Sequence, residues 1–175
     1  MLYHVEGTVT DIDSNLVVVD CHGIGFALNV SLNTIAAVRV GSQSKLYIYE
    51  SVREDAFDLF GFASKEEKRC FEMLIGISGV GPKAAISILS TNTPTGLAIA
   101  VLNDDMKALS NAPGIGKKIA QRIILELKDK IANEGIKVSK GYYSDKALLI
   151  SGYGFIKKVP GYKEGEFTVQ DESSI

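Results

Sequence analysis

The chain has 175 residues, of which 46% are hydrophobic and 23% charged, and a formal net charge of −2. This length and composition allow one or two small domains with a packed core. No apolar run approaches the roughly 20 residues of a membrane-spanning helix, and the N-terminus lacks the basic and apolar regions of a secretion signal. The two cysteines, Cys21 and Cys70, lack the spacing of metal ligands, so we expect a cytoplasmic protein with reduced thiols and no membrane partner.

Residues 2–63 have the pattern of short β-strands. Segments of alternating or β-branched residues are separated by turn residues at 11–15 and 21–23, and a short helix is expected between Leu32 and Val40. Because glycines occur where a tight barrel must bend, this pattern favours a closed five-stranded β-barrel of the OB type, with an SH3-like barrel as the alternative. The expected strands are 3–10, 16–20, 24–30, 45–52 and 57–62.

The pattern becomes helical at Ser64. Ser64 and Glu67 have the spacing of a capping box, in which each side chain bonds the backbone of the other at a helix start. Phe71, Leu74 and Ile75 would share one face of that helix. Further helices are expected from Pro82 to about Leu89, from Pro94 to about Leu102, from a cap at Asp104 to near Asn111, and from Lys117 to about Asn133.

A Gly-x-Gly turn that enters a helix occurs twice in this helical segment, at Ile77–Ala85 and at Ala112–Ala120. A single copy is equally well explained by an ordinary helix–turn–helix corner. Two copies with a lysine in register indicate a tandem of helix-hairpin-helix motifs. The aligned pairs are Gly79 with Gly114, Gly81 with Gly116, Lys83 with Lys118 and Ala85 with Ala120.

These turns predict contacts with a nucleic-acid backbone. The glycines Gly79, Gly81, Gly114 and Gly116 would present free backbone N–H groups at the positive end of a helix dipole, which suits phosphate oxygens. The side chains of Lys83, Lys117, Lys118 and Arg122 would add charge-assisted contacts, whereas Lys107, Lys128 and Lys130 are expected to be ordinary surface charges. All these contacts would be independent of base sequence.

The charge is distributed in a way that allows such a ligand, although the net charge alone argues against one. Residues 1–63 carry three Lys and Arg against eight Asp and Glu, a net of −5. Residues 64–134 carry ten against eight, a net of +2, and residues 135–175 carry six against five, a net of +1. A basic element therefore follows an acidic one.

No catalytic constellation, metal site or cofactor motif is evident in the sequence. His4 and His22 have no matched nucleophile, and neither glycine turn has the Walker pattern, so ATP hydrolysis would be the work of a partner. The alternative function is a helix-hairpin-helix DNA repair enzyme, a glycosylase or a nuclease. Such a glycosylase needs a catalytic Asp after its hairpin, and only Asp129 is available there.

The chain from residue 1 to about 134 resembles the RuvA family, which binds Holliday junctions. The shared features, in order, are Met-x-x-x-x-x-Gly-x-Val at the start, Val-Arg-Glu-Asp-Ala at 52–56, Leu-Phe-Gly-Phe at 59–62, and the two glycine hairpins. The resemblance implies a non-catalytic DNA-binding subunit of recombination and repair, assembled as a homotetramer or an octamer. It also implies the ATPase RuvB and the resolvase RuvC as partners.

The resemblance gives Glu54 and Asp55 a role that their sequence context does not. By themselves they would be a solvated hairpin tip between the last two barrel strands. In the family, this position is an acidic pin at the centre of the tetramer. Its negative charge would repel backbone phosphates and keep the four strands apart at the crossover.

We expect an α+β multi-domain fold with an OB barrel at 1–63, an all-α double helix-hairpin-helix domain at 64–134, and a linker with an irregular tail at 135–175. The family's RuvB-binding domain is not recognisable in this tail, so the sequence does not support contact with RuvB there. Residues 150–154 and 160–174 instead resemble a segment of RsmB/Sun-type 16S rRNA cytosine methyltransferases. A fragment of such an RNA methyltransferase is a third alternative.

Overall fold

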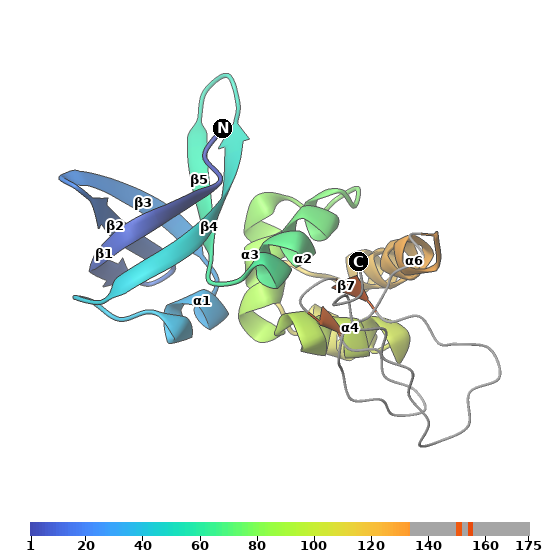
Figure 1. The fold of residues 1–175 in the computed structure, drawn as a ribbon. Coiled ribbons are helices and arrows are strands. Elements are labelled where there is room, and N and C mark those ends of the chain that lie inside the picture. Colours follow the sequence, from blue (N-terminus) through green and yellow to red (C-terminus); the bar gives the residue numbers. More distant parts are fainter. Residues whose placement is uncertain (134–149, 152–153, 156–175) are drawn as a thin grey trace, which may run out of the picture.

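The computed structural model describes residues 1–133, 150–151 and 154–155, in which a five-stranded barrel is followed by a group of helices (Figure 1). The barrel strands alternate buried and exposed residues over much of their length, as expected for strands with one face on a core. The change from strands to helices falls between Phe62 and Lys65. The strands are β1 (His4–Asp13), β2 (Leu16–Cys21), β3 (Ile24–Val30), β4 (Gln43–Val52) and β5 (Phe57–Phe62), with helix α1 (Leu32–Ala37) between β3 and β4.

The strand order confirms the predicted OB-type barrel and excludes the SH3-like alternative. The barrel is closed in the order β1-β2-β3-β5-β4, with β4 paired to β1. All pairs are antiparallel except β3 with β5, where Asn29 pairs with Phe60 and Val30 with Gly61. A Cβ atom at Gly61 would lie 2.9 Å from the Leu28 side chain, so a larger residue in this parallel pairing would force Leu28 to shift.

The first strand is longer than predicted. It was expected to end at Thr10 and to turn at 11–15, but β1 extends to Asp13 and the turn is only Ser14 and Asn15. The cause is that β1 pairs with β4 over His4–Thr8 and with β2 from Thr8 onward, with an irregularity between Val9 and Asp11 that bends it between its two neighbours. Polar residues on the outer face of this second half resemble a turn in the sequence.

The helices agree with the predicted segments, with one corrected cap. Thr93 accepts a hydrogen bond from Gly96 N–H, and Pro82 takes the first helical position, as expected. The short helix is capped by Asp105, which accepts a hydrogen bond from Ala108 N–H, and not by the predicted Asp104. The helices are α2 (Lys65–Ile75), α3 (Pro82–Thr91), α4 (Pro94–Leu102), α5 (Met106–Ser110) and α6 (Lys117–Asn133).

Asp104 has a different role from the predicted one. It has a positive φ of 55° and forms an ion pair of 2.7 Å with Lys128 of α6. A residue in the left-handed region cannot provide the extended N-cap geometry. The cap is therefore displaced by one residue.

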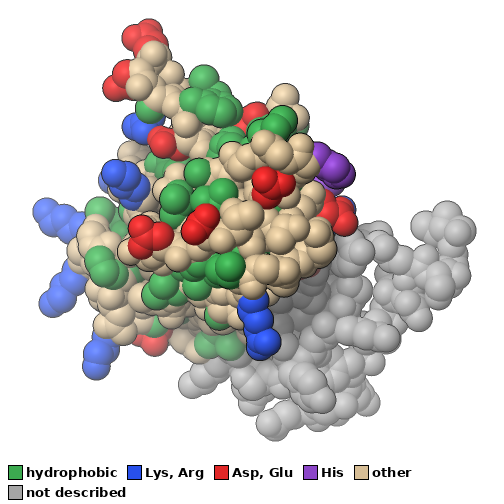
Figure 2. All heavy atoms as spheres, turned by 90° about the vertical axis from the view of Figure 1, so that its left-hand side faces the viewer, with side chains coloured by type: hydrophobic (Ala, Val, Ile, Leu, Met, Phe, Trp, Pro, Cys, Tyr) green, Lys and Arg blue, Asp and Glu red, His purple; other side chains and the backbone are tan. Residues whose placement is uncertain are grey.

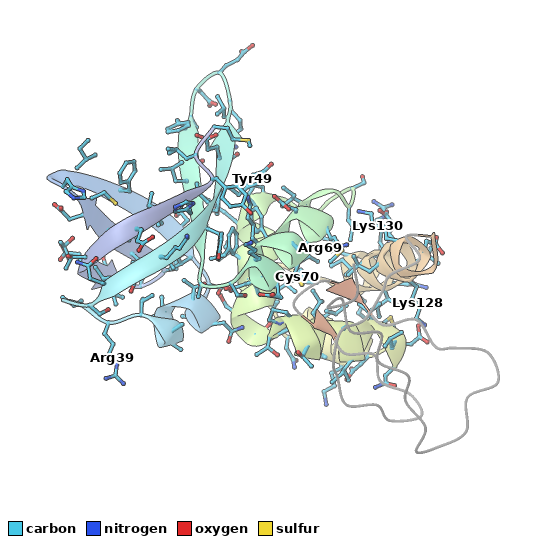
Figure 3. The ribbon with its side chains drawn as sticks, viewed as in Figure 1. Arg39, Tyr49, Arg69, Cys70, Lys128 and Lys130 are labelled. Carbon is cyan, nitrogen blue, oxygen red and sulfur yellow. The ribbon has the colours of Figure 1, made fainter. Side chains whose placement is uncertain are left out.

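An aromatic cluster joins the barrel to the helices. The ring centroid of Phe71 in α2 lies 4.9 Å from that of Phe62 and 5.2 Å from that of Phe60, both in β5. Tyr49 of β4, which is labelled in Figure 3, contacts the same Phe71 ring. Phe60 and Phe62 therefore belong to the core of the helices, whereas a separate core inside the barrel consists of Val5, Val9, Val17, Val19, Leu28, Val30, Val38, Leu46 and Ile48.

The predicted capping box at the start of α2 is only half formed. Ser64 accepts a hydrogen bond from Glu67 N–H, as predicted. The Glu67 carboxylate does not return to Ser64. It is buried and accepts hydrogen bonds from the hydroxyls of Ser31 and Thr34 at the start of α1. A carboxylate buried on folding needs such donors, and the barrel supplies them.

No single helix in the described part of the chain is long and apolar enough to cross a membrane, and α3 with α4 meets that test only as a pair bent by 92°. Beyond α6, the strands β6 (Ile150–Ser151) and β7 (Gly154–Phe155) pair in antiparallel fashion. The rest of the predicted linker and tail at 135–175 lies outside the described residues, as does Glu134.

Candidate nucleic-acid interface

The first glycine turn joins α2 to α3 and exposes its backbone. Gly79 has a φ of +90°, which a residue with a side chain adopts only with strain. Val80 is 4% exposed and donates a backbone hydrogen bond to Ile77 O, so the residue between the glycines anchors the turn in the core. Gly81 then caps α3, where Ala85 N–H donates to Gly81 O at 2.9 Å. Both glycines are thereby left at the surface.

The second turn, between α5 and α6, repeats this geometry. Gly114 has a φ of +84°, and Ile115 is 5% exposed and donates a backbone hydrogen bond to Ala112 O. Ala120 N–H donates to Gly116 O at 2.9 Å, the distance found between Ala85 and Gly81. The sequence repeat is therefore also a structural repeat, because equivalent backbone hydrogen bonds form in both turns.

Glycine occupies the two positions of each turn for different physical reasons. Gly79 and Gly114 need their positive φ. Gly81 and Gly116 have no such φ, and a Cβ atom built on either would meet no other atom within 4 Å. The fold itself does not require glycine at these two positions. Their effect is to leave bare backbone at a helix N-terminus, where an external anion can approach closely.

The predicted lysines at the turns are exposed and unpaired in the described part of the chain. Lys83 lies in the first turn of α3, and Lys117 and Lys118 lie in the first turn of α6. Lys128 and Lys130 are engaged elsewhere. Lys128 pairs with Asp104, and Lys130 donates to Met73 O near the end of α2 (Figure 3).

Arg122 lies on the second repeat but reaches the first turn. Its Nη1 donates a hydrogen bond of 3.0 Å to Ser78 O, and a Cβ at Gly79 would lie 4.0 Å from the same Nη1. In the opposite direction, the Ser87 hydroxyl of α3 donates at 3.0 Å to Pro113 O, directly before the second turn. The sequence prediction named Arg122 as a phosphate contact without assigning it to either turn, and it missed Ser87. These two hydrogen bonds bring the two turns together.

The predicted acidic pin lies at the tip of the β4–β5 hairpin, which projects beyond the barrel (Figure 1). Arg53 and Ala56 close a two-residue loop through reciprocal backbone hydrogen bonds, and Glu54 and Asp55 form the exposed tip. An ion pair of 2.9 Å between Arg53 and Asp58 braces the base. Figure 2 shows acidic side chains at this tip and others over the barrel face.

The side chains considered for the alternative catalytic roles all lie in the described part of the structure. No three His, Cys, Asp or Glu side chains there come together as metal ligands. Asp129, the only candidate acid for a glycosylase, is exposed on α6. His22 occupies a β-turn with a φ of 57°, and His4 is exposed in β1.

Comparison with known proteins identifies both parts of the fold. The family model described as RuvA N terminal domain matches residues 1–61, and the one described as SAM-like Helix-hairpin-helix tandem matches residues 71–129. Three similar proteins are each named Holliday junction branch migration complex subunit RuvA. That of Acetivibrio thermocellus is 47% identical over 169 residues, which cover 87% of this chain and 84% of the relative.

The other two relatives show the same extent of similarity. The Thermoanaerobacter sp. (strain X514) protein is 44% identical over 170 residues, covering 96% of this chain and 91% of the relative. The Bacteroides thetaiotaomicron protein is 42% identical over 151 residues, covering 86% of this chain and 75% of the relative. Because 96% of this chain is covered in one alignment, the similarity extends into residues 135–175.

Proposed function

This chain belongs to the RuvA family, and on that premise we propose that it is a non-catalytic DNA-binding subunit that recognises Holliday junctions and supports RuvB-driven branch migration. The observation that carries the proposal is the pair of equivalent glycine turns, joined by hydrogen bonds between Arg122 and Ser78 and between Ser87 and Pro113. Two phosphate sites at a fixed separation can hold a duplex arm without reading its bases.

Each turn would hold phosphate by two kinds of contact. Free backbone N–H groups around Gly79 and Gly81, and around Gly114 and Gly116, would donate to phosphate oxygens, and the exposed lysines would neutralise charge. Such contacts release counterions and are independent of sequence. This suits a protein that must remain bound while a junction moves through any sequence.

The acidic tip of the β4–β5 hairpin would act by repulsion. Glu54 and Asp55 are exposed at the end of a projecting hairpin and form no ion pair within the described residues, since the neighbouring Arg53 pairs with Asp58. Negative charge at a junction centre would keep the four phosphate backbones apart while the glycine turns hold the arms.

The double variant Glu54→Gln with Asp55→Asn should therefore lose preference for the open, square junction over the stacked one. A fluorescence measurement of the angle between arms tests this, and an unchanged angle would show that the acidic tip does not act on the crossover.

The pin requires an assembly in which several copies meet. We propose a homotetramer around one junction, with eight glycine turns and two turns on each duplex arm; a second tetramer would make an octamer. Light scattering of the 18.9 kDa chain with a four-way junction should give a mass of four or eight chains per DNA. One chain per junction would leave the acidic tips without a centre.

The proposed partners are the ATPase RuvB, which would hydrolyse ATP and drive the DNA, and the resolvase RuvC, all acting in the cytoplasm. The functional division would follow residues 1–63, 64–134 and 135–175, and coupling to RuvB would not need the RuvB-binding domain that is unrecognisable beyond residue 134. A branch migration assay with RuvB and ATP tests the coupling. Junction binding without RuvB-dependent migration would separate the two roles and show that this chain's tail does not engage the motor.

A further inference from the structure

We propose that the two glycine turns exchange side chains, meaning that the helix after each turn contributes a side chain to the other turn. Arg122 of α6, which follows the second turn, contacts the phosphate bound at the first turn. Ser87 of α3, which follows the first turn, holds the second turn in position. The proposal rests on the DNA-binding role proposed above and assigns Arg122 to a different turn from the one its place in the sequence suggests. It begins from an equivalence in the repeat. The offset that aligns Gly79 with Gly114 also aligns Ser87 with Arg122.

The contacts of these two residues are reciprocal. Arg122 of the second repeat donates to Ser78 O of the first, and Ser87 of the first repeat donates to Pro113 O of the second. Ser78 and Pro113 are themselves aligned by the same offset. Equivalent positions on the two helices thus bond equivalent carbonyl groups on the opposite turn, as expected for two motifs related by an approximate twofold axis.

The Ser87 bond is not the usual one for a serine inside a helix. Such a hydroxyl commonly bonds the carbonyl four residues earlier in its own helix. Ser90 does so with Ile86 O, and Ser110 does so with Met106 O. Ser87 instead reaches the carbonyl of Pro113. Its hydroxyl therefore holds the second turn against α3.

The exchange balances the positive charge at the two turns. The second repeat has adjacent lysines, Lys117 and Lys118, whereas the first has Pro82 in place of the former and only Lys83. Placing the Arg122 guanidinium beside Gly79 gives the first turn its second cation. Each turn then has two cations.

The chemistry of the guanidinium allows both tasks at once. Arginine has five N–H donors in a rigid planar group, and among the described contacts only Nη1 is engaged, with Ser78 O. The exposed remainder can donate to a phosphate bound at Gly79 and Gly81. Arg122 is thus both a positioning residue for the first turn and a phosphate contact in it.

Double-mutant cycles in four-way junction binding test this assignment. We expect the effects of Arg122→Ala and Lys83→Ala to be coupled, because both residues would contact one phosphate site. Each substitution alone should weaken binding about 10-fold. The double variant should be weakened by less than the product of the two single effects, and the difference should be about threefold or more. Arg122→Ala and Lys118→Ala should be additive. Lys107→Ala is the control for loss of a charge away from both turns.

Ser87→Ala provides the mirror-image test without changing the charge. It should weaken junction binding in a way coupled to Lys118→Ala and additive with Lys83→Ala, while leaving the salt dependence of binding unchanged. Coupling of Arg122 to Lys118, or to neither lysine, would overturn the exchange. If the unmodified chain binds linear duplex as well as it binds junctions, the junction function fails, but the same cycles on duplex still decide the exchange.

Discussion

The hydroxyl of Thr34 in α1 donates a hydrogen bond of 2.6 Å to the carboxylate of Glu67 in α2. Glu67 is 3% exposed and also accepts from the Ser31 hydroxyl, while Thr34 accepts from Ala63 N–H. A buried polar network therefore joins α1 of the barrel region to α2, the first helix of the helical region. Because the acidic hairpin belongs to the barrel and the glycine turns to the helices, this network helps to fix the position of one relative to the other.

Replacing Glu67 by Ala should lower the free energy of unfolding by about 2 kcal/mol or more, since two buried hydroxyls would lose their acceptor. Glu66→Ala, in the same helical turn and without a hydrogen bond across to α1 in the described structure, should cost less than about 1 kcal/mol. Urea unfolding of both variants measures the difference. Equal effects would mean that the network contributes little.

The two glycines of each turn should respond oppositely to alanine. Gly79→Ala and Gly114→Ala force a side chain into the left-handed region and should cost about 1–2 kcal/mol of stability. Gly81→Ala and Gly116→Ala should leave stability nearly unchanged, because nothing lies within 4 Å of the added Cβ. They should nevertheless weaken DNA binding by obstructing the approach of a phosphate. Thermal unfolding and gel shifts on the same four variants would show this; unchanged DNA binding in Gly81→Ala and Gly116→Ala would contradict it.

The lysines at the turns should control the salt dependence of binding. Lys83→Ala and Lys118→Ala should each lower affinity equally for all base sequences. Each should also flatten the slope of log affinity against log salt by about 0.9 for every phosphate that is no longer neutralised. Affinity measured between low and moderate salt gives the slope. If the slope changes no more than in Lys107→Ala, these lysines do not contact phosphate.

The barrel and the glycine turns could be predicted because they depend on local patterns. Strand alternation, the Gly-x-Gly spacing and Pro82 at a helix start each act within a few residues. The missed features depend on contacts between distant segments. Glu67 has the spacing of a capping box, but the hydroxyls that bind it come from α1, more than 30 positions earlier.

The position of Arg122 could not be predicted from its sequence neighbours for the same reason. Its hydrogen-bond partner Ser78 is 44 residues away, in the other repeat. A signal for Ser87 did exist, because the repeat aligns it with Arg122, and both are polar residues at equivalent helix positions. The exchange between turns became evident only from the hydrogen bonds.

Cys70 should be inert in the folded protein. Burial raises the pKa of its thiol from the ordinary value of 9.0 to about 12, and the neighbouring Glu67 adds to the rise. Because the thiolate is the reactive form, a Cys21→Ser variant should not react with a thiol reagent at pH 8 until it unfolds. Rapid reaction of the native variant would contradict the burial of this thiol.

The same pKa shift has a consequence for stability. The folded state favours the neutral thiol, so this contribution to stability is complete below about pH 9 and is lost as the pH rises toward 12. A Cys70→Ala variant should therefore lose less stability than the unmodified chain between pH 9 and pH 12. Unfolding midpoints of the two proteins across this range make the comparison.

The central claim is that paired glycine turns and an acidic tip together select a four-way junction. The most direct measurement is a competition gel shift between a four-way junction and a linear duplex of the same length and sequence, at one salt concentration near physiological strength. We predict that the junction is retained at a large excess of duplex. Equal competition by the two DNAs would contradict the claim and leave only a general binder of duplex DNA.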